Sequence, residues 1–243
     1  MLRVVFMGTP DFAEESLKAV YEAGYKIEAV VTNVDKPKGR GMKLIPSPVK
    51  QFAESKGLKV LQPIKVKNNV EFLEEIRNIN PDVICVVAYG KILPKDLLDI
   101  PKYGCVNVHG SLLPKYRGAA PIQWAVLNGD KTTGITTMYM NEGMDTGDMI
   151  LKEEVEIGEE ETTGELWNRL SQVGAKLLVE TLKLIESENA AREKQGEDFT
   201  LAPMLNKEMA KIDWENKSAD EIKNLVRGLN PIMGAYSFID GKK

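Results

Sequence analysis

Two stretches decide the fold of this chain: Asp82-Val83-Ile84-Cys85-Val86-Val87-Ala88 and Cys105-Val106-Asn107-Val108-His109-Gly110-Ser111-Leu112-Leu113-Pro114. The first is an almost continuous apolar run. In the second, apolar and polar residues alternate until a glycine and a proline end the pattern. Both stretches are typical of buried strands that finish in a loop. Apolar strands separated by helical patterns predict a parallel sheet with helices on both faces.

The segments on either side of these strands extend the same alternation of strand and helix. The two strands over 135–139 and 149–155 are joined by turn residues, so we expect that part of the sheet to become antiparallel. The sequence predicts an α/β fold with further strands over 2–7, 27–32 and 58–61, and with helices over 11–23, 47–57, 70–79, 120–129 and 163–186.

The composition excludes several classes of protein. The chain has 243 residues, of which 43% are hydrophobic and 28% charged, and its net charge of −4 argues against nucleic-acid binding by the whole surface. No apolar run approaches the ~18 residues that span a bilayer. The apolar start is too short for a signal peptide and is predicted to be the first strand, so we expect a cytoplasmic protein.

The sequence lacks the motifs of two common kinds of cofactor site. The first predicted strand ends in Gly8-Thr9-Pro10-Asp11-Phe12, which is neither of the glycine-rich patterns that hold nucleotide phosphates. We therefore expect no dinucleotide. Cys85 and Cys105 lie in apolar runs without the spacing of a zinc site, so they are predicted to be free buried thiols, and no metal is expected.

His109 is the single histidine of the chain and a candidate catalytic residue. Side chains two positions apart on a strand share a face, so Asn107 and His109 should point to the same small volume. Imidazole is the side chain that titrates near neutral pH. A hydrogen-bonded core histidine is the simpler alternative, and the amide beside it makes that alternative weaker.

A turn rich in glycine and aspartate supplies a third candidate catalytic residue. Asp145 lies between Gly143 and Gly147 in the segment 141–148. Such a turn can be a plain surface feature with solvated carboxylates. If Asp145 approaches His109, its carboxylate favours the protonated ring and orients it.

A basic segment over 33–46 is the candidate for contact with a phosphate backbone. It is predicted to be a flexible loop, its only acidic residue is Asp35, and its cations are Lys36, Lys38, Arg40 and Lys43. A solvated surface loop is the alternative. Lysine and arginine neutralise phosphates, and glycines let such a loop approach closely.

The last fifth of the chain has a different character. Residues 188–206 are predicted to be a polar linker. They are followed by a capped helix over 218–228, a strand over 235–239 and a hairpin turn at Asp240-Gly241.

Taken together, several motifs carry a resemblance to a known family. The motifs occur in order along the chain as Gly8-Thr9-Pro10-Asp11-Phe12-Ala13, Lys36-Pro37-Lys38-Gly39-Arg40-Gly41, Val87-Ala88-Tyr89-Gly90, Asn107-Val108-His109-Gly110-Ser111-Leu112-Leu113-Pro114, Tyr116-Arg117-Gly118-Ala119-Ala120-Pro121 and Asp145-Thr146-Gly147-Asp148. With these motifs the chain resembles the methionyl-tRNA formyltransferases, and the Asn-x-His pair with a downstream Asp is shared by the wider formyltransferase family.

The resemblance implies a Rossmann-like catalytic domain over 1–187 and, over 207–243, the beginning of a small OB-like β-barrel that binds tRNA and is expected to be incomplete here. It implies an enzyme that passes the formyl group of 10-formyltetrahydrofolate to methionine on initiator tRNA. Asn107 and His109 would bind the developing oxyanion, and Asp145 would hold the ring charged. The basic residues from Lys36 to Lys43 would contact tRNA, and the folate would lie along Ser111, Leu112, Leu113, Pro114, Ala88, Tyr89, Gly90, Ile92 and Leu93.

Two alternatives stay open at this point. One is a formyltransferase that acts on a small amine, of the nucleotide-sugar or glycinamide-ribonucleotide type, which leaves the basic loop without a role. The other is a folate- or RNA-binding module without turnover, which leaves the three candidate catalytic residues without one. For either enzyme we expect a monomer that does not associate with membranes.

Overall fold

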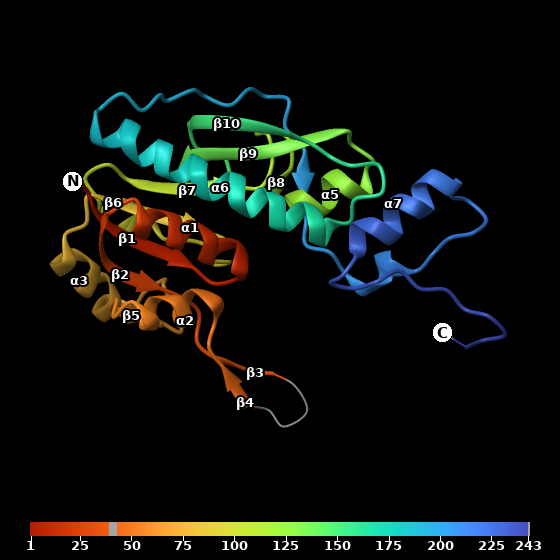
Figure 1. The fold of residues 1–243 in the computed structure, drawn as a ribbon, viewed down its shortest axis with the longest axis horizontal. Coiled ribbons are helices and arrows are strands. Elements are labelled where there is room, and N and C mark those ends of the chain that lie inside the picture. The colour runs from red at the N-terminus through yellow and green to blue at the C-terminus, as the bar shows by residue number, and fades with distance from the viewer. Residues whose placement is uncertain (39–42, 243) are drawn as a thin grey trace.

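The computed structural model describes residues 1–38 and 43–242, and for Lys38 and Lys43 it describes the backbone only. Its centre is a seven-stranded sheet in the order β10-β9-β7-β6-β1-β2-β5 (Figure 1). The strands from β7 to β5 are parallel, and β9 and β10 are antiparallel, as predicted. The strands are β1 (Arg3–Gly8), β2 (Lys26–Val31), β5 (Val60–Leu61), β6 (Val83–Val87), β7 (Cys105–His109), β9 (Thr132–Tyr139) and β10 (Met149–Glu156).

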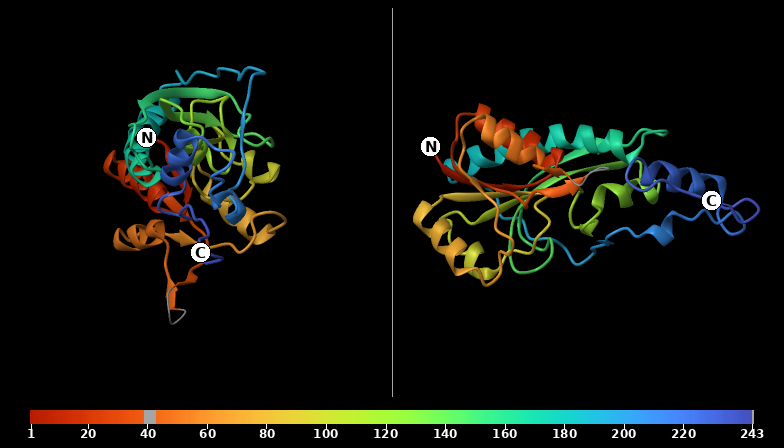
Figure 2. Two further views of the ribbon diagram at one scale, coloured as in Figure 1. Left: turned by 90° about the vertical axis from the view of Figure 1, so that its right-hand side faces the viewer. Right: turned by 90° about the horizontal axis from the view of Figure 1, so that it is seen from below.

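Helices cover both faces of the sheet, which buries its apolar side chains in two cores. The larger core joins the sheet to α1 (Asp11–Glu22), α2 (Pro48–Ser55), α5 (Pro121–Leu127) and α6 (Thr163–Glu186). The smaller core joins it to α3 (Val70–Ile79) and α4 (Lys95–Leu98). Figure 2 shows α1 and α6 on one side of the sheet and α3 on the other. No helix in the described part of the chain has the length and apolar character needed to cross a bilayer.

Local sequence signals explain why the long helices begin and end as predicted. The Thr162 side chain accepts from the Glu165 amide, and the Glu165 carboxylate accepts from the Thr162 amide, so two helix-end donors of α6 are satisfied. In α3 the Asn69 side chain accepts from the Phe72 amide. The predicted bounds of these two helices agree with the structure.

Residues 36–38 and 43–45 of the basic segment form the paired strands of a hairpin, so the expectation of a flexible loop was wrong for these residues. Strands β3 (Lys36–Lys38) and β4 (Lys43–Ile45) pair antiparallel and project away from the body beside α2 (Figure 1). Pro37 lies opposite Leu44 in this ribbon. Proline disfavours central strands, but a two-stranded ribbon has a free edge that tolerates its missing N–H.

The predicted strand over 235–239 is also wrong. Tyr236 makes an isolated bridge with Lys211, and Ile239 makes another with Lys242. Among the described residues, the only backbone that pairs with 235–238 is the short stretch 210–212, which is too little to extend a ladder. The predicted turn is present, since Asp240 and Gly241 both have positive φ, at 49° and 75°.

Besides β3 and β4, four further short elements were not predicted, because two to four residues carry no periodicity. They are α4, already described, β8 (Arg117–Gly118), β11 (Leu201–Ala202) and the 3₁₀ turn Lys207–Ala210. β8 and β11 pair in parallel, so the chain segment after α6 returns to the body and contacts it.

The two cysteines are free and buried, as predicted. Cys85 belongs to the larger core and Cys105 to the smaller one, so the two thiols lie on opposite faces of the sheet. Burial raises the pKa of the Cys85 thiol above its usual range and that of Cys105 to about 12.

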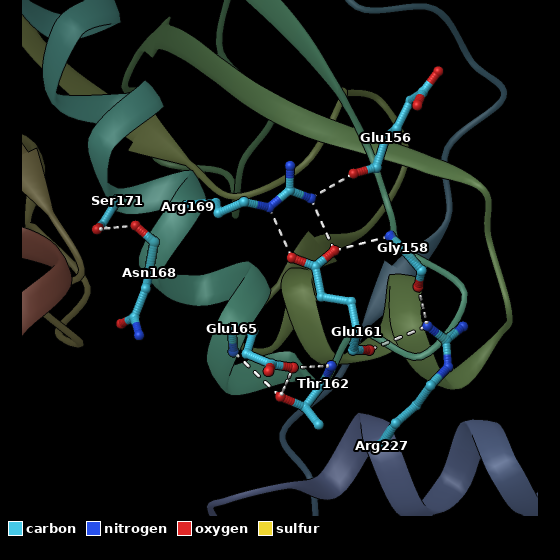
Figure 3. A network of polar contacts seen from close by, with 9 residues as sticks. All are labelled: Glu156, Gly158, Glu161, Thr162, Glu165, Asn168, Arg169, Ser171 and Arg227. Atoms are coloured by element: carbon cyan, nitrogen blue, oxygen red, sulfur yellow. Dashed lines mark hydrogen bonds and ion pairs between the residues drawn. The ribbon is translucent and has the colours of Figure 1, made fainter.

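A buried arginine connects α7 (Ala219–Leu229) by hydrogen bonds to the loop that precedes α6 (Figure 3). One guanidinium nitrogen of Arg227 donates to the Gly158 and Glu161 carbonyls, at 3.0 and 3.2 Å. Glu161 in turn receives two hydrogen bonds from Arg169 on α6, at 2.7 and 2.8 Å. This network fixes α7 against the loop that leads into α6.

Replacing Arg227 by alanine should lower the free energy of unfolding by about 1–3 kcal/mol, because the carbonyls of Gly158 and Glu161 lose a donor that is itself buried. Urea unfolding followed by circular dichroism measures the change. The matched control is Lys223→Ala on the same helix, which removes an exposed ion pair with Glu160 and should change the free energy of unfolding much less. Equal stability of the Arg227 variant and the wild type would contradict the role of this network.

Candidate active site

The candidate site lies where β6 and β7 end at the same edge of the sheet. These two strands are parallel neighbours, so the loops after Val87 and after His109 leave the sheet side by side. In open α/β sheets, the carboxyl ends of parallel strands are where ligands usually bind. The structure therefore brings the residues predicted over 88–93 and 107–114 into one region.

His109 is the last residue of β7 and is almost fully buried, with 5% of its surface exposed. Its Nε2 atom lies 2.9 Å from the carbonyl oxygen of Tyr116. Because a carbonyl can only accept a hydrogen bond, Nε2 carries a proton. This contact fixes the ring plane and leaves Nδ1 as the atom that faces Asp145.

Asp145 lies beside His109, an approach that the turn alone did not predict. One carboxylate oxygen is 3.7 Å from His109 Nδ1, and the other accepts from the Gly118 amide at 2.8 Å. The backbone of Asp145 has a φ of 53°, a left-handed conformation that aspartate tolerates better than most residues. The turn thus brings a carboxylate from a distant part of the sequence against the imidazole ring.

Asn107 supplies a free amide on the same face of β7. Cys105, Asn107 and His109 alternate along the strand with Val106 and Val108, which belong to the larger core. The Asn107 side chain is half-buried and makes no hydrogen bond to any described residue. A partly buried amide without a partner is a donor available to a ligand.

The loop after β7 is held to the sheet by β9. The Thr136 hydroxyl donates to the Ser111 carbonyl at 2.7 Å and accepts from the Leu113 amide at 3.1 Å. The side chains of Ser111 and Leu113 are buried within the fold, whereas those of Leu112 and Pro114 are partly exposed. Leu112, Pro114 and the loop backbone are thus the parts that a ligand can reach.

The loop after β6 turns sharply, since Ala88 and Gly90 have positive φ of 44° and 75°. Tyr89 is buried, its hydroxyl has no hydrogen-bond partner within the described residues, and burial raises the pKa of Tyr89 to about 12. Leu93 is buried too, whereas Ile92 is 89% exposed. Of the predicted folate residues in this loop, Ala88 and Ile92 are therefore the two whose side chains face solvent.

The base of the basic hairpin is rigidly anchored. Asp35, the only acid of this segment, accepts from Lys50 at 2.7 Å and from Gln62 at 2.8 Å. The Lys50 ammonium lowers the pKa of the Asp35 carboxyl. Lys36 is exposed on β3. Arg40 lies outside the described residues, and so do the side chains of Lys38 and Lys43.

Two site residues, Tyr116 and Gly118, were missed because they act through backbone groups. Tyr116 presents its carbonyl to His109 from a left-handed conformation with φ of 61°. Gly118 donates its amide to Asp145, and a side chain there would lie 2.6 Å from the Ala202 carbonyl oxygen. The glycine itself was a usable signal, but the carbonyl of a tyrosine gives none in sequence.

A cavity of 570 Å³ lies elsewhere, between the start of α6 and residues 230–232, and none of the predicted site residues lines it. The side chains at the end of β7 include groups that can take part in catalysis.

An amide donor and an imidazole can stabilise an oxygen that gains negative charge. A neighbouring carboxylate can orient the ring or accept a proton. This set suits group transfer from a carbonyl carbon.

Two family models match the sequence. Residues 2–182 match the model described as formyl transferase, and residues 204–243 match that described as formyl transferase, C-terminal domain. Among curated relatives, the methionyl-tRNA formyltransferase of Caldanaerobacter subterraneus subsp. tengcongensis is 56% identical over 242 residues, which are 99% of this chain and 78% of the relative. That of Clostridioides difficile is 56% identical over 237 residues, which are 97% of this chain and 76% of the relative.

Solved structures share the fold at much lower identity. A 4-N formyltransferase from Francisella tularensis superposes with a TM-score of 0.78 at 17% identity, covering 100% of this chain and 94% of that one. A sugar N-formyltransferase from a Shewanella species gives a TM-score of 0.74 at 20% identity, covering 100% and 95%. These similarities show that the chain shares the fold of these structures. At such low identity they do not indicate which substrate this chain uses.

Proposed function

Because this chain belongs to the formyl transferase family, we propose that it transfers the formyl group of 10-formyltetrahydrofolate to the α-amino group of methionine on initiator methionyl-tRNA. One observation carries the choice of acceptor. Relatives named methionyl-tRNA formyltransferase are 56% identical to it over almost its entire length, including the part after residue 203. The product would be N-formylmethionyl-tRNA for translation initiation, made by a cytoplasmic enzyme.

The proposed reaction exchanges one carbon–nitrogen bond for another. The acceptor amine attacks the formyl carbon, the bond from that carbon to the folate nitrogen breaks, and the proton lost by the amine is balanced by the one that the folate nitrogen takes up. The formyl oxygen gains negative charge as the attack proceeds. Asn107 and His109 supply the donors for that oxygen, and Asp145 receives or relays the proton.

The hydrogen bond to Tyr116 determines which ring nitrogen takes part. Nε2 of His109 is committed to the Tyr116 carbonyl, so the formyl oxygen would be bound by Nδ1, the atom that faces Asp145. The half-buried Asn107 amide without a partner fits the second donor. The carboxylate therefore lies next to the position where the reacting atoms would meet.

The remaining assignments follow from where the predicted segments lie. The folate would be bound by the loops over 88–93 and 111–114, largely through backbone groups and the exposed parts of Leu112, Pro114 and Ile92. The tRNA would be contacted by the basic hairpin with Lys36, Lys38, Arg40 and Lys43, and by residues 207–243 as part of an OB-like domain. No metal or dinucleotide takes part in this proposal, and the enzyme would act as a monomer.

The proposed function is tested by offering 10-formyltetrahydrofolate with one acceptor at a time. Charged initiator tRNA should be formylated, whereas an amino nucleotide sugar and glycinamide ribonucleotide should not. Formyl transfer is measured by acid precipitation of labelled product and by release of tetrahydrofolate. Turnover with either small amine, and none with tRNA, would replace the proposed acceptor while keeping the chemistry.

Removing either oxyanion donor should reduce turnover strongly. Asn107→Ala and His109→Ala should each lower kcat by at least about a hundredfold, because one such donor contributes roughly 2.7–4 kcal/mol to the transition state. Binding of the folate should change little. The control Asn189→Ala alters an exposed asparagine outside the site and should keep wild-type kcat. A folded Asn107 or His109 variant with near-normal turnover would refute the assignment.

Substitutions in the basic hairpin should change the KM for tRNA and leave the KM for small substrates unchanged. Arg40→Ala should raise the KM for tRNA, because one phosphate contact is lost. A plot of log KM against the logarithm of the salt concentration should have a slope smaller by about one for the same reason. The control Lys26→Ala removes an exposed cation that pairs with Glu28 on another part of the surface. An unchanged salt slope in the Arg40 variant would argue against a phosphate contact.

A further inference from the structure

The segment between α6 and β11 runs back along the body of the protein instead of leaving it (Figure 1). Glu193 exchanges two backbone hydrogen bonds with Met149 at the start of β10, at 2.8 and 3.0 Å. Further on, Leu201 and Ala202 pair with β8. The stretch between these two anchors therefore has a defined position, and Gln195 lies within it.

Gln195 reaches from this segment into the turn that carries Asp145. Its side-chain nitrogen donates to the Asp145 carbonyl at 2.8 Å and to the Gly147 carbonyl at 2.9 Å. Its side-chain oxygen accepts from Arg117 Nε at 2.9 Å. The Gln195 side-chain nitrogen thus lies against two carbonyl acceptors, and its oxygen lies against a guanidinium donor. If the amide were rotated by 180°, none of these three hydrogen bonds could form.

The turn needs such a support because much of it is exposed. Residues 141–144 face solvent, and Asp145 itself is held in a left-handed conformation. On the inner side the backbone is already in close contact, since a side chain at Gly147 would lie 1.7 Å from the Tyr139 carbonyl oxygen. Gln195 donates to the Asp145 and Gly147 carbonyls of the same turn, so both the sheet and the returning segment hold the turn in place.

We propose that Gln195 is a positioning residue for formyl transfer, which holds the Asp145 carboxylate against His109. Gln195 lies outside residues 2–182, the part of the chain matched by the catalytic family model. The segment predicted to be a linker thus completes the catalytic site. This inference rests on the proposed function for its kinetic consequences, but the position of Asp145 can be measured without turnover.

Two variants of Gln195 test the kinetic consequence. Gln195→Glu keeps the length of the side chain and an acceptor for Arg117, but it places a carboxylate oxygen against two carbonyls. Gln195→Ala removes all three contacts. Both should lower kcat by about tenfold to a hundredfold through misplacement of Asp145, with the KM for the formyl donor within about twofold of wild type. The pH profile of kcat should change as well.

The single histidine provides a readout that does not depend on activity. Labelled histidine gives one set of ring nitrogen resonances, and the Nδ1 signal reports on the carboxylate beside it. Both Gln195 variants should shift this signal. The control is Gln172→Ala, since Gln172 is an exposed glutamine on α6 that contacts Glu15 and should leave kcat and the His109 signal unchanged.

The outcomes separate the two proposals. Wild-type kcat in the Gln195 variants, or reduced kcat with an unchanged His109 signal, overturns the positioning role. A shifted signal with reduced kcat and near-constant KM supports it. If the wild type transfers no formyl group to any acceptor, the proposed function fails, and the His109 signal alone then decides whether Gln195 positions Asp145. Spectra are recorded well below the melting temperature of each variant, so that loss of folding is not mistaken for loss of position.

Discussion

β7 pairs with the parallel strand β6 along one edge and with the antiparallel strand β9 along the other, and each group of the candidate site takes its place from this arrangement. Parallel pairing brings the loops after β6 and β7 to one edge of the sheet. Antiparallel pairing places Tyr139, at the end of β9, beside Val106 near the start of β7, and the turn that follows folds back so that Asp145 lies against His109. The alternation of side chains along β7 then sends valines into the larger core and leaves the polar residues facing that turn.

The extent to which the sequence predicts this structure depends on the range of each interaction. The helix α6 was predictable to the residue because its capping box and its apolar stripe are both local. The strands β3 and β4 were missed because each has three residues and because proline and glycine favour a loop. The anchor at Asp35 was missed because it joins this segment to Lys50 and Gln62. Such contacts between distant segments leave no periodic trace in the sequence.

The same distinction holds within the site. Asn107, His109 and Asp145 could be singled out because their residue types carry chemistry and their local patterns are distinctive. Tyr116 and Gly118 contribute a carbonyl and an amide, which every residue but proline possesses in full. Gln195 lies in a polar stretch whose composition is that of a connecting segment. Its contacts with Asp145 and Gly147 become visible only when the fold places the two segments together.

The two buried cysteines give the protein a pair of internal probes. Each thiol lies under a different helical layer, Cys85 beneath the layer with α1 and α6 and Cys105 beneath that with α3 and α4. Burial keeps both in the unreactive thiol form, so an alkylating reagent reacts only when a layer opens. Because the two residues are chemically identical, the ratio of their labelling rates compares the opening of the two halves of the molecule directly. A ligand that stabilises one half would thus slow the labelling of the cysteine in that half relative to the other.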